Sequence, residues 1–439
     1  MRKASAGDRT IGMKFFASDV DGTGGRLKAD NTHFRVTEIP DVAVQPVTAS
    51  ESKYPYLVVR VRLDGWDTYG FVHRLAGELS ISRERITWAG TKDKAAITTQ
   101  LFSLKQVNPA DLPDIAGAEI VPVGRFGRGL YFGDLIGNRF DLTVTNPANP
   151  EAHAAVTSSL REFGQGRIAV PNYFGHQRFG SIRPITHTVG FRILSRDWHG
   201  AVMAYLGETH ENEPADTRSA RRFVRETEDW EQALERFPNR LQHERRLLER
   251  LVELTPSTPA EYRSALDAFP ESLQGLFVHA AQSYLFNLIV SRRMESGISL
   301  TEAIPGDIVC FTRETEALGR IPDIEQQQIV TDRRTTVINR HMRAGRALLT
   351  APLIGTETDL GTGDPAALIS EVMAETGITR ADFDLPQPFH STGTRRALLL
   401  FPDISVSTDP LSFSFGLPSG SYATVVMREY LKGPPTMLG

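Results

Sequence analysis

The amino-acid sequence predicts an α+β fold in which a second α+β domain is inserted into the first. Strand-like and helix-like segments interleave through short connections over the first 180 residues, and charged helix-like segments dominate from about residue 195. Strand-like segments return near the C-terminus. Short connections between interleaved elements favour a mixed sheet over a barrel. The order of the three regions is expected when both ends of a chain build one domain around an insertion.

The N-terminal region contains four segments with clear patterns. Residues 56–63 end in alternating apolar and basic side chains, which predicts a strand. Residues 68–79 carry apolar side chains at helical spacing. Residues 97–102 are rich in β-branched and apolar side chains, and residues 137–144 are typical of a glycine-led turn into a strand. We expect these segments to belong to the first α+β domain.

The middle of the chain is predicted to be helical. Residues 196–250 mix arginine and glutamate, and helices with solvated charged faces are the simplest interpretation. Residues 272–294 have a broad apolar face, which predicts a longer helix.

Strands are predicted again towards the C-terminus. Residues 347–355 form a short apolar run, and a loop with glycine and proline is expected at residues 416–420. The strands are predicted at residues 306–311, 395–401 and 421–430.

Length and composition limit the possible functions. A chain of 439 residues with 40% hydrophobic side chains can bury more than one core, so two domains are expected. The formal net charge of −4 neither indicates nor excludes a polyanionic partner, because binding depends on the local potential. The one cysteine, Cys310, lies in an apolar run and is expected to be a buried, unreactive thiol. No stretch is long enough to span a bilayer and no export-type segment precedes the fold, so a cytoplasmic protein is expected.

The segment Gly90-Thr91-Lys92-Asp93-Lys94 carries the first chemical signal. It places one carboxylate between two lysines at a glycine-led bend, immediately before a predicted strand. Gly90 can adopt the left-handed geometry of a tight turn, and nearby positive charge favours an ionised carboxylate. Covalent catalysis by aspartate requires that ionised form. Taken alone, such a segment is more often a solvated surface turn.

Three further segments concentrate functional groups. Residues 171–180 place three aromatic side chains, an amide, a histidine and an arginine between a proline and two glycines. Such a loop offers rings for stacking a base and donors for its edges, although an aromatic corner of a core has the same composition. Residues 416–430 alone indicate only a junction between a loop and a strand or helix. Arginines cluster at residues 333–346, where they would contact phosphates or lie in a solvated turn.

In this order, the segments resemble the TruD family of RNA pseudouridine synthases over nearly the whole chain. Residues 90–93 are similar to the catalytic loop of the family, and residues 172–180 to its most distinctive string. Further similarities are Lys28 with Phe34, Val36 and Glu38, Gly133 with Gly137, Asn138 and Phe140, residues 281–287, and residues 417–424. The length of the inserted part is similar to the archaeal or eukaryotic branch.

The resemblance implies an isomerase that converts uridine to pseudouridine in RNA without a cofactor or metal. It implies tRNA as the partner, with position 13 in the D-arm as the target, and a mixed, largely antiparallel sheet flanked by helices. Asp93 takes the place of the catalytic aspartate, which would attack the ribose or the base. Asn172 would bind the uracil edge or order the pocket, and Phe174 and Tyr422 would shape the pocket around the base. Lys28 and Lys92 would lie near the substrate.

The resemblance also implies a catalytic domain over residues 1–180 and 386–439 and an inserted domain over residues 181–385. The sequence departs from the family pattern at Asn31-Thr32-His33, where many relatives have Pro-Glu-Asp before the phenylalanine. Any role of that acidic pair in ordering the active-site loop is therefore in doubt.

Two alternative functions remain open from the sequence alone. One is an RNA-binding protein with the same fold but without catalysis. The other, more remote, is a phosphate-handling enzyme that uses Gly90-Thr91-Lys92, although the segment lacks the glycine spacing of a P-loop. The sequence gives no prediction of the oligomeric state.

Overall fold

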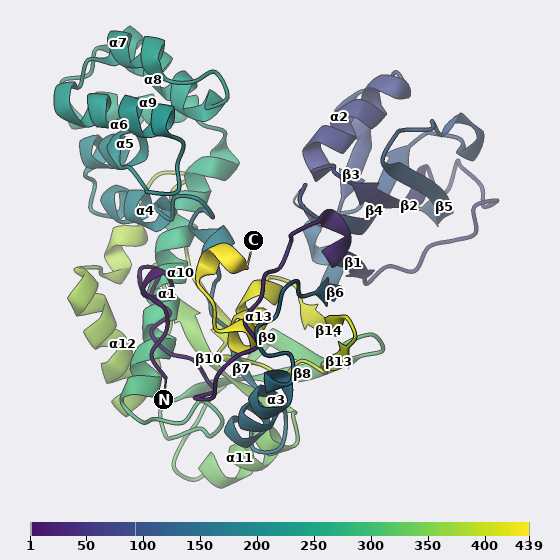
Figure 1. The fold of residues 1–439 in the computed structure, drawn as a ribbon, viewed down its shortest axis with the longest axis vertical. Coiled ribbons are helices and arrows are strands. Elements are labelled where there is room, and N and C mark those ends of the chain that lie inside the picture. The colour runs from purple at the N-terminus through teal and green to yellow at the C-terminus, as the bar shows by residue number, and fades with distance from the viewer. Residues whose placement is uncertain (1, 93, 439) are drawn as a thin grey trace. The chain divides into compact units, whose positions relative to one another are not determined.

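A computed structural model of the chain describes residues 2–92 and 94–438 (Figure 1). The chain forms two compact units. The sheet unit consists of residues 17–170, 314–321 and 400–439, and the helical unit of residues 1–16, 171–313 and 322–399. Segments far apart in the sequence thus build each unit. These bounds reflect packing only, so the catalytic and inserted domains stay a prediction.

The sheet unit is built on an eight-stranded sheet with the order β13-β14-β6-β1-β4-β2-β5, and β3 pairs with β4 (Figure 1). The pair β1–β4 is parallel and the other pairs are antiparallel. The predicted α+β class with a mixed, largely antiparallel sheet is therefore confirmed. The strands are β1 (Phe34–Pro40), β2 (Tyr56–Asp64), β3 (Ile86–Trp88), β4 (Ile97–Lys105), β5 (Ala118–Phe126), β6 (Leu135–Thr143), β13 (Ser405–Thr408) and β14 (Leu411–Pro418), and the helices are α2 (Thr68–Glu78), α3 (Ala152–Phe163) and α13 (Ala423–Leu431).

Helix α2 packs on β2 and β4 through its apolar side. Phe71, Val72 and Leu75 are buried in one cluster with side chains of both strands. The helix begins after Asp67, whose Oδ1 accepts a hydrogen bond from Gly70 N at 2.9 Å. The helix predicted at residues 68–79 and the strands predicted at residues 56–63 and 97–102 are confirmed.

Helix α13 differs from the sequence prediction, which placed a strand at residues 421–430. All nine residues of α13 are buried, so no polar side reveals the helical period in the sequence. The helix packs beside α3, where the Tyr430 hydroxyl lies 3.1 Å from Thr157 Oγ1. Packing on all sides overrides the strand propensity of the two adjacent valines.

Two glycines on neighbouring strands allow Leu318 to pack on the sheet. A Cβ at Gly137 would lie 2.5 Å from Leu318 Cδ1, and one at Gly416 would lie 2.4 Å from Leu318 Cδ2. Gly137 is inside β6 rather than in the predicted turn before it, and residues 416–418 continue β14 rather than form the predicted loop. Gly416 is thus explained by a close side-chain approach, and Gly137 by the approach of both Leu318 and the Leu417 backbone oxygen, at 2.2 Å from such a Cβ.

The helical unit contains a four-stranded sheet with the order β11-β10-β8-β9 and a bundle of helices (Figure 1). The strands are β8 (Ile308–Thr315), β9 (Gly319–Ile329), β10 (Ala347–Leu353) and β11 (Thr394–Ala397), of which residues 314–321 are counted with the sheet unit. Two short strands at the unit bounds, β7 (Val170–Pro171) and β12 (Leu399–Leu400), pair with each other. The helices are α1 (Ala6–Arg9), α4 (Thr186–Leu194), α5 (Trp198–Gly207), α6 (Ala215–Thr227), α7 (Trp230–Arg236), α8 (Gln242–Leu254), α9 (Pro259–Ala265), α10 (Glu271–Glu295), α11 (Thr335–Arg343) and α12 (Gly363–Thr376).

The long helix α10 lies at the centre of the helical unit, with α4, α12 and β10 packed on it. The helix predicted at residues 272–294 is therefore confirmed. The strand predicted at residues 395–401 is divided into β11 and β12 by Leu398. Cys310 in β8 is buried, as expected, and burial raises its pKa to about 12, which disfavours the reactive thiolate.

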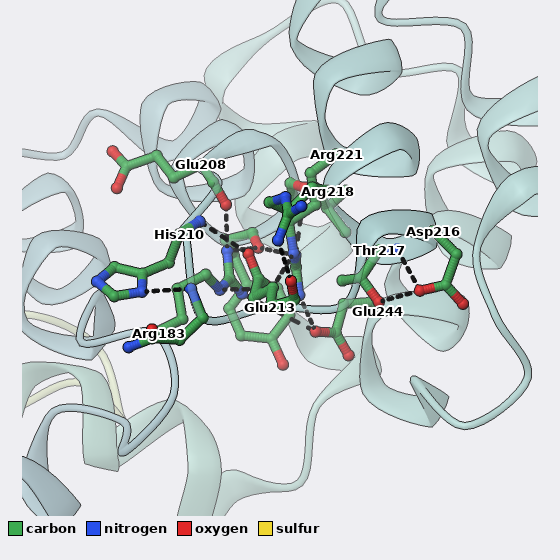
Figure 2. Close-up of polar contacts among 12 residues, drawn as sticks. Arg183, Glu208, His210, Glu213, Asp216, Thr217, Arg218, Arg221 and Glu244 are labelled. Carbon is green, nitrogen blue, oxygen red and sulfur yellow. Dashed lines mark hydrogen bonds and ion pairs between the residues drawn. The ribbon is translucent and has the colours of Figure 1, made fainter. Parts of the chain in front are cut away.

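The charged helices bury part of their charge instead of exposing all of it. The Arg221 side chain is 2% exposed, and it donates to Glu213 Oε1 at 2.8 Å and to Glu244 Oε1 at 2.7 Å (Figure 2). Arg183 lies within 4 Å of the same two carboxylates. Burial and the nearby charge of Arg221 lower the pKa of Arg183 to about 10. The prediction of solvated charged faces at residues 196–250 is therefore wrong for Glu213, Arg221 and Glu244. Together with Arg183 they balance two positive and two negative charges inside the unit.

Candidate active site

The predicted catalytic residue, Asp93, lies outside the described residues, but its neighbours on both sides are described. β3 and β4 pair in antiparallel fashion, with Ile86 opposite Leu104 and Trp88 opposite Phe102. Residues 89–96 therefore connect two strands of the sheet unit, and β4 begins at Ile97 as the sequence predicted.

Gly90 is explained by close packing rather than by a tight turn. It is not among the described glycines with a positive φ, so the expected left-handed geometry is wrong. A Cβ at this position would lie 2.7 Å from Glu38 Oε1 and 2.9 Å from Leu135 Cδ2. Any larger residue would push the loop away from β1 and from the start of β6.

Lys92 forms a buried ion pair with Glu38 of β1. The Lys92 ammonium donates to Glu38 Oε1 at 2.6 Å, and the two side chains are 10% and 2% exposed. The Glu38 carboxylate also accepts hydrogen bonds from two neutral donors, Gln100 Nε2 at 3.2 Å and Leu101 N at 3.3 Å. A charge buried to this degree needs such a partner, because desolvation would otherwise exclude it.

The same network holds the backbone of the loop. Gln100 Nε2 donates to Gly90 O at 2.8 Å, and Lys92 N donates to Thr68 Oγ1 at 2.8 Å. Thr68 Oγ1 in turn donates to Gln100 Oε1 at 3.1 Å, which joins the start of α2 to β4. The segment that leads into Asp93 is therefore fixed at two backbone positions by buried side chains.

Lys28 precedes β1, which begins at Phe34. Its Nζ is 4.5 Å from the centre of the Phe34 ring, and its φ of 54° is in the left-handed region, which is unusual for a residue other than glycine. Phe34 is buried and contacts Phe140 of β6 edge to face. The alternation of buried residues in β1 places Phe34 and Glu38 on one face of the strand. β1 therefore provides the partners of both predicted lysines from the same face.

Tyr422 stands directly before α13. Its side chain is half-buried, its backbone is extended, and its carbonyl accepts a hydrogen bond from Val425 N at 3.1 Å. The backbone that carries this side chain is thus fixed at the start of a fully buried helix, which is a rigid support.

Asn172 belongs to the helical unit, and its side-chain amide is engaged by two residues of β11. The Nδ2 group donates to Ala397 O at 2.9 Å, and Oδ1 accepts from Arg396 Nη2 at 2.5 Å. Arg396 Nε also donates to Asn172 O at 3.0 Å. An amide with both ends bonded to the protein is oriented by it, which favours the predicted role of ordering a pocket over that of reading a base.

Phe174 lies two residues further along the same loop. The Arg396 guanidinium carbon lies 4.1 Å from the centre of its ring, and Phe286 of α10 meets it edge to face at 5.6 Å. Asn287 fixes the backbone, because its Oδ1 accepts from Phe174 N at 2.8 Å and its Nδ2 donates to Phe174 O at 3.0 Å. The ring is buried, with 6% of the residue exposed.

The sequence did not reveal three of these residues as parts of a site. Arg396 lies in a predicted strand without any motif, and only the structure brings it to Asn172 and Phe174. Gln100 had been interpreted only as a strand residue. Asn287 ends the string at residues 281–287 that resembles the family, and an amide in an otherwise apolar helix face was a signal that could have indicated its role.

The predicted arginine cluster is exposed. Arg333, Arg334, Arg340, Arg343 and Arg346 lie on or beside α11 with exposed side chains. Arg343 is 3.4 Å from Glu302, and both side chains are about half exposed, so this pair adds little stability. A role in phosphate binding stays a prediction.

Two structural features are absent from the part of the chain that the structure describes. No group of three or more histidine, cysteine or acidic side chains there is placed to hold a metal ion. No helix there combines the length and apolar character that a membrane crossing requires.

Comparison with known proteins identifies the family. The family model for tRNA pseudouridine synthase D (TruD) matches residues 10–430. The "Probable tRNA pseudouridine synthase D" of Halobacterium salinarum is 51% identical over 439 residues and covers all of both chains, and that of Natronomonas pharaonis is 46% identical over 440 residues. The crystal structure of a TruD protein from Methanosarcina mazei matches with a TM-score of 0.80 and 35% identity, over 99% of each chain. The chain therefore belongs to the TruD family of tRNA pseudouridine synthases, which are RNA-modifying isomerases.

Proposed function

We propose that this tRNA pseudouridine synthase acts on the uridine at position 13 in the D-arm and uses Asp93 as its nucleophile. The buried network of Glu38, Lys92 and Gln100 carries the proposal, because it fixes the backbone directly before Asp93. Holding a nucleophile in place removes much of the entropic barrier to attack. An ion pair buried at such a desolvation cost is unexpected for a surface turn without a chemical role.

The proposed reaction conserves all atoms and needs no redox step. The Asp93 carboxylate attacks C1′ of the ribose, the C1′–N1 bond breaks, and the uracil leaves with the electron pair. The uracil turns over, its C5 attacks C1′, and the carboxylate is displaced. C5 then loses its proton and N1 gains one, which restores the aromatic base and regenerates the enzyme. The ionised form of Asp93 is required at the first step.

The other predicted site residues would hold the uridine. We assign base stacking to Tyr422, since a base stacked on an aromatic ring gains about 1–3 kcal/mol, and shaping of the pocket to the buried ring of Phe174. This gain would offset part of the few kcal/mol needed to extrude the nucleotide. We assign Asn172 to ordering the Phe174 loop, because its amide is bonded to Ala397 and Arg396.

The two lysines would act differently from each other. Lys28 is proposed to lie near the substrate, where its charge is supported by the face of the Phe34 ring. Lys92 is bonded to Glu38 and is therefore proposed to reach the substrate through its effect on the loop.

Release of tritium from tRNA labelled at uracil C5 tests the proposal. The wild-type protein should release tritium, and Asp93→Asn should release none while it still binds tRNA. Asp114→Asn, at an exposed position of the same unit, is the matched control and should keep wild-type activity. Equal release by wild type and Asp93→Asn would reject the nucleophile. Release that persists when position 13 carries cytidine would reject the position but not the chemistry.

A further inference from the structure

Two neighbouring aromatic side chains in the sheet unit face solvent. Tyr131 is 55% exposed and Phe132 is 64% exposed. We call these two residues the aromatic pair. They lie in the connection between β5 and β6, and the residues on both sides, Leu130 and Leu135, are buried. The chain is thus anchored at both ends and turns two large rings outward between the anchors.

The loop that carries the aromatic pair is held rigidly. Asp134 accepts hydrogen bonds from Tyr131 N at 3.0 Å and from two nitrogens of Arg128, each at 2.7 Å. Leu130 N donates to Ser103 Oγ at 3.1 Å, which ties the loop to β4. A Cβ at Gly133 would lie 2.4 Å from Tyr131 Cε2, so the glycine lets the tyrosine ring rest on the backbone. Because the backbone of the loop and the Tyr131 ring are held in this way, little entropy is lost when they bind a partner.

The Arg128 guanidinium packs over the Tyr131 ring. Its guanidinium carbon is 4.4 Å from the centre of the Tyr131 ring and 4.8 Å from that of Phe126. Burial of Asp134 opposes its ionisation, but the hydrogen bonds from Arg128 and Tyr131 N outweigh burial, and the pKa of Asp134 lies below its usual range. The Arg128–Asp134 pair is therefore charged at neutral pH and keeps the loop in one shape.

The aromatic pair belongs to the surroundings of the candidate catalytic loop. Leu135 faces Gly90, since a Cβ at Gly90 would lie 2.9 Å from Leu135 Cδ2. Thr87 of β3 approaches Gly129 closely, because a Cβ at Gly129 would lie 2.7 Å from Thr87 Oγ1. The segment that carries the two rings thus contacts both the strand before the loop and the loop itself.

We propose that Tyr131 and Phe132 stack on unpaired bases of the tRNA next to the target uridine. Exposed aromatic rings on a rigid loop are the usual platform for single-stranded nucleic acid, since every base has a face to stack. Bases inside an A-form duplex are already stacked, so the occupants must be nucleotides in a loop or nucleotides unstacked when the uridine is extruded. The inference rests on tRNA as the substrate and does not depend on the role of Asp93.

The test compares RNA affinity with the rate of the bound complex. Tyr131→Ala and Phe132→Ala should each raise the Kd and the KM for tRNA about tenfold, within the range measured for loss of one stacked base. The single-turnover rate at saturating tRNA should stay near that of the wild type. Tyr131→Phe should retain the wild-type affinity, because it keeps the ring. Val121→Ala, an exposed apolar residue of β5, is the matched control and should change neither value.

A fluorescent base reports the stacking directly. With 2-aminopurine placed beside the target uridine, binding of wild-type protein should quench the fluorescence, and Phe132→Ala should lose much of the quenching. Wild-type affinity in both alanine variants would overturn the proposal. A changed sedimentation coefficient of the protein alone with unchanged tRNA affinity would also overturn it, since the pair would then be a protein contact. Binding is measured apart from turnover, so an inactive wild type that binds tRNA would count against the proposed chemistry only.

Discussion

Loss of the Lys92 ammonium should destabilise the protein, because the Glu38 carboxylate would stay buried without its charged partner. The two side chains are 10% and 2% exposed, and their charged atoms are 2.6 Å apart. In Lys92→Met the carboxylate keeps only the neutral donors Gln100 Nε2 and Leu101 N, at 3.2 and 3.3 Å. Breaking a buried pair on one side costs about 3–5 kcal/mol. The two remaining donors place the expected loss at the lower end of that range.

A double variant measures the interaction energy between Glu38 and Lys92 separately from the contribution of each side chain. Glu38→Gln keeps an acceptor for the ammonium but removes the charge, which should cost about 2 kcal/mol, as for a hydrogen bond to a charged group. Glu38→Gln with Lys92→Met buries no charge, so it should be more stable than the sum of the single variants by about 2 kcal/mol. Because the network also holds Gly90 O and Lys92 N, each single variant should lower the single-turnover rate about 100-fold. The KM for tRNA should change little.

Urea unfolding and single-turnover kinetics of the four proteins measure both effects. The exposed pair Arg74–Glu78 on α2 is the matched control, since its side chains are 59% and 37% exposed at a distance of 2.6 Å. Arg74→Met should cost about 0.5 kcal/mol or less and leave the rate unchanged. If Lys92→Met kept its stability and its rate but raised the KM and flattened the salt dependence of binding, Lys92 would be a phosphate contact. The argument from the buried pair would then be refuted.

Two further predictions concern stability. Burial lowers the pKa of His187 from 6.5 to about 4, so the unfolded chain takes up the proton first as the pH falls. The free energy of unfolding should therefore have its full value above about pH 6.5 and fall by about 3 kcal/mol towards pH 4. His187→Phe should remove this part of the acid sensitivity. Urea unfolding would contradict the prediction if the wild type and the variant lost the same free energy of unfolding between pH 7 and pH 4. A second prediction concerns the two glycines beside Leu318. In Gly416→Ala the new Cβ would contact only the end of the Leu318 side chain, which should lower the free energy of unfolding by about 1 kcal/mol. In Gly137→Ala the new Cβ would lie 2.2 Å from Leu417 O, so the loss should be larger. Adding Leu318→Ala should rescue the first variant but not the second, and equal rescue in thermal unfolding would show that the backbone at Leu417 moves aside.

Elements with one buried and one exposed side could be predicted from the sequence, because their apolar residues recur at a regular spacing. Helix α2 and the second half of strand β2 each have one buried and one exposed side, so their apolar residues recur with the period of the element. Helix α13 is buried on all sides and was mistaken for a strand, since a uniformly apolar segment carries no period. The burial of Arg221 was missed for a related reason, because its partners Glu213 and Glu244 come from other segments of the chain.

The candidate site shows the same limit. Motifs identified Asn172 and Phe174, because they stand together in one distinctive string. Arg396, which contacts both, lies 224 residues from Asn172 in the sequence and stands in no motif of its own. Gly90 was correctly singled out for the wrong reason, since its neighbour Glu38 belongs to another strand. Contacts between distant segments are set by the fold and leave no local pattern.

Three cations among the candidate residues are already engaged, each within its own unit. Lys92 is bonded to Glu38, Arg128 to Asp134, and Arg396 to Asn172. A cation that keeps its protein partner releases few counterions from RNA, and each phosphate contact adds about 0.7–0.9 to the salt slope of binding. Stacking on aromatic rings does not depend on salt in this way. In a chain with a net charge of −4, affinity near the target uridine should therefore come mainly from rings, and salt-dependent affinity from exposed arginines such as those on and beside α11.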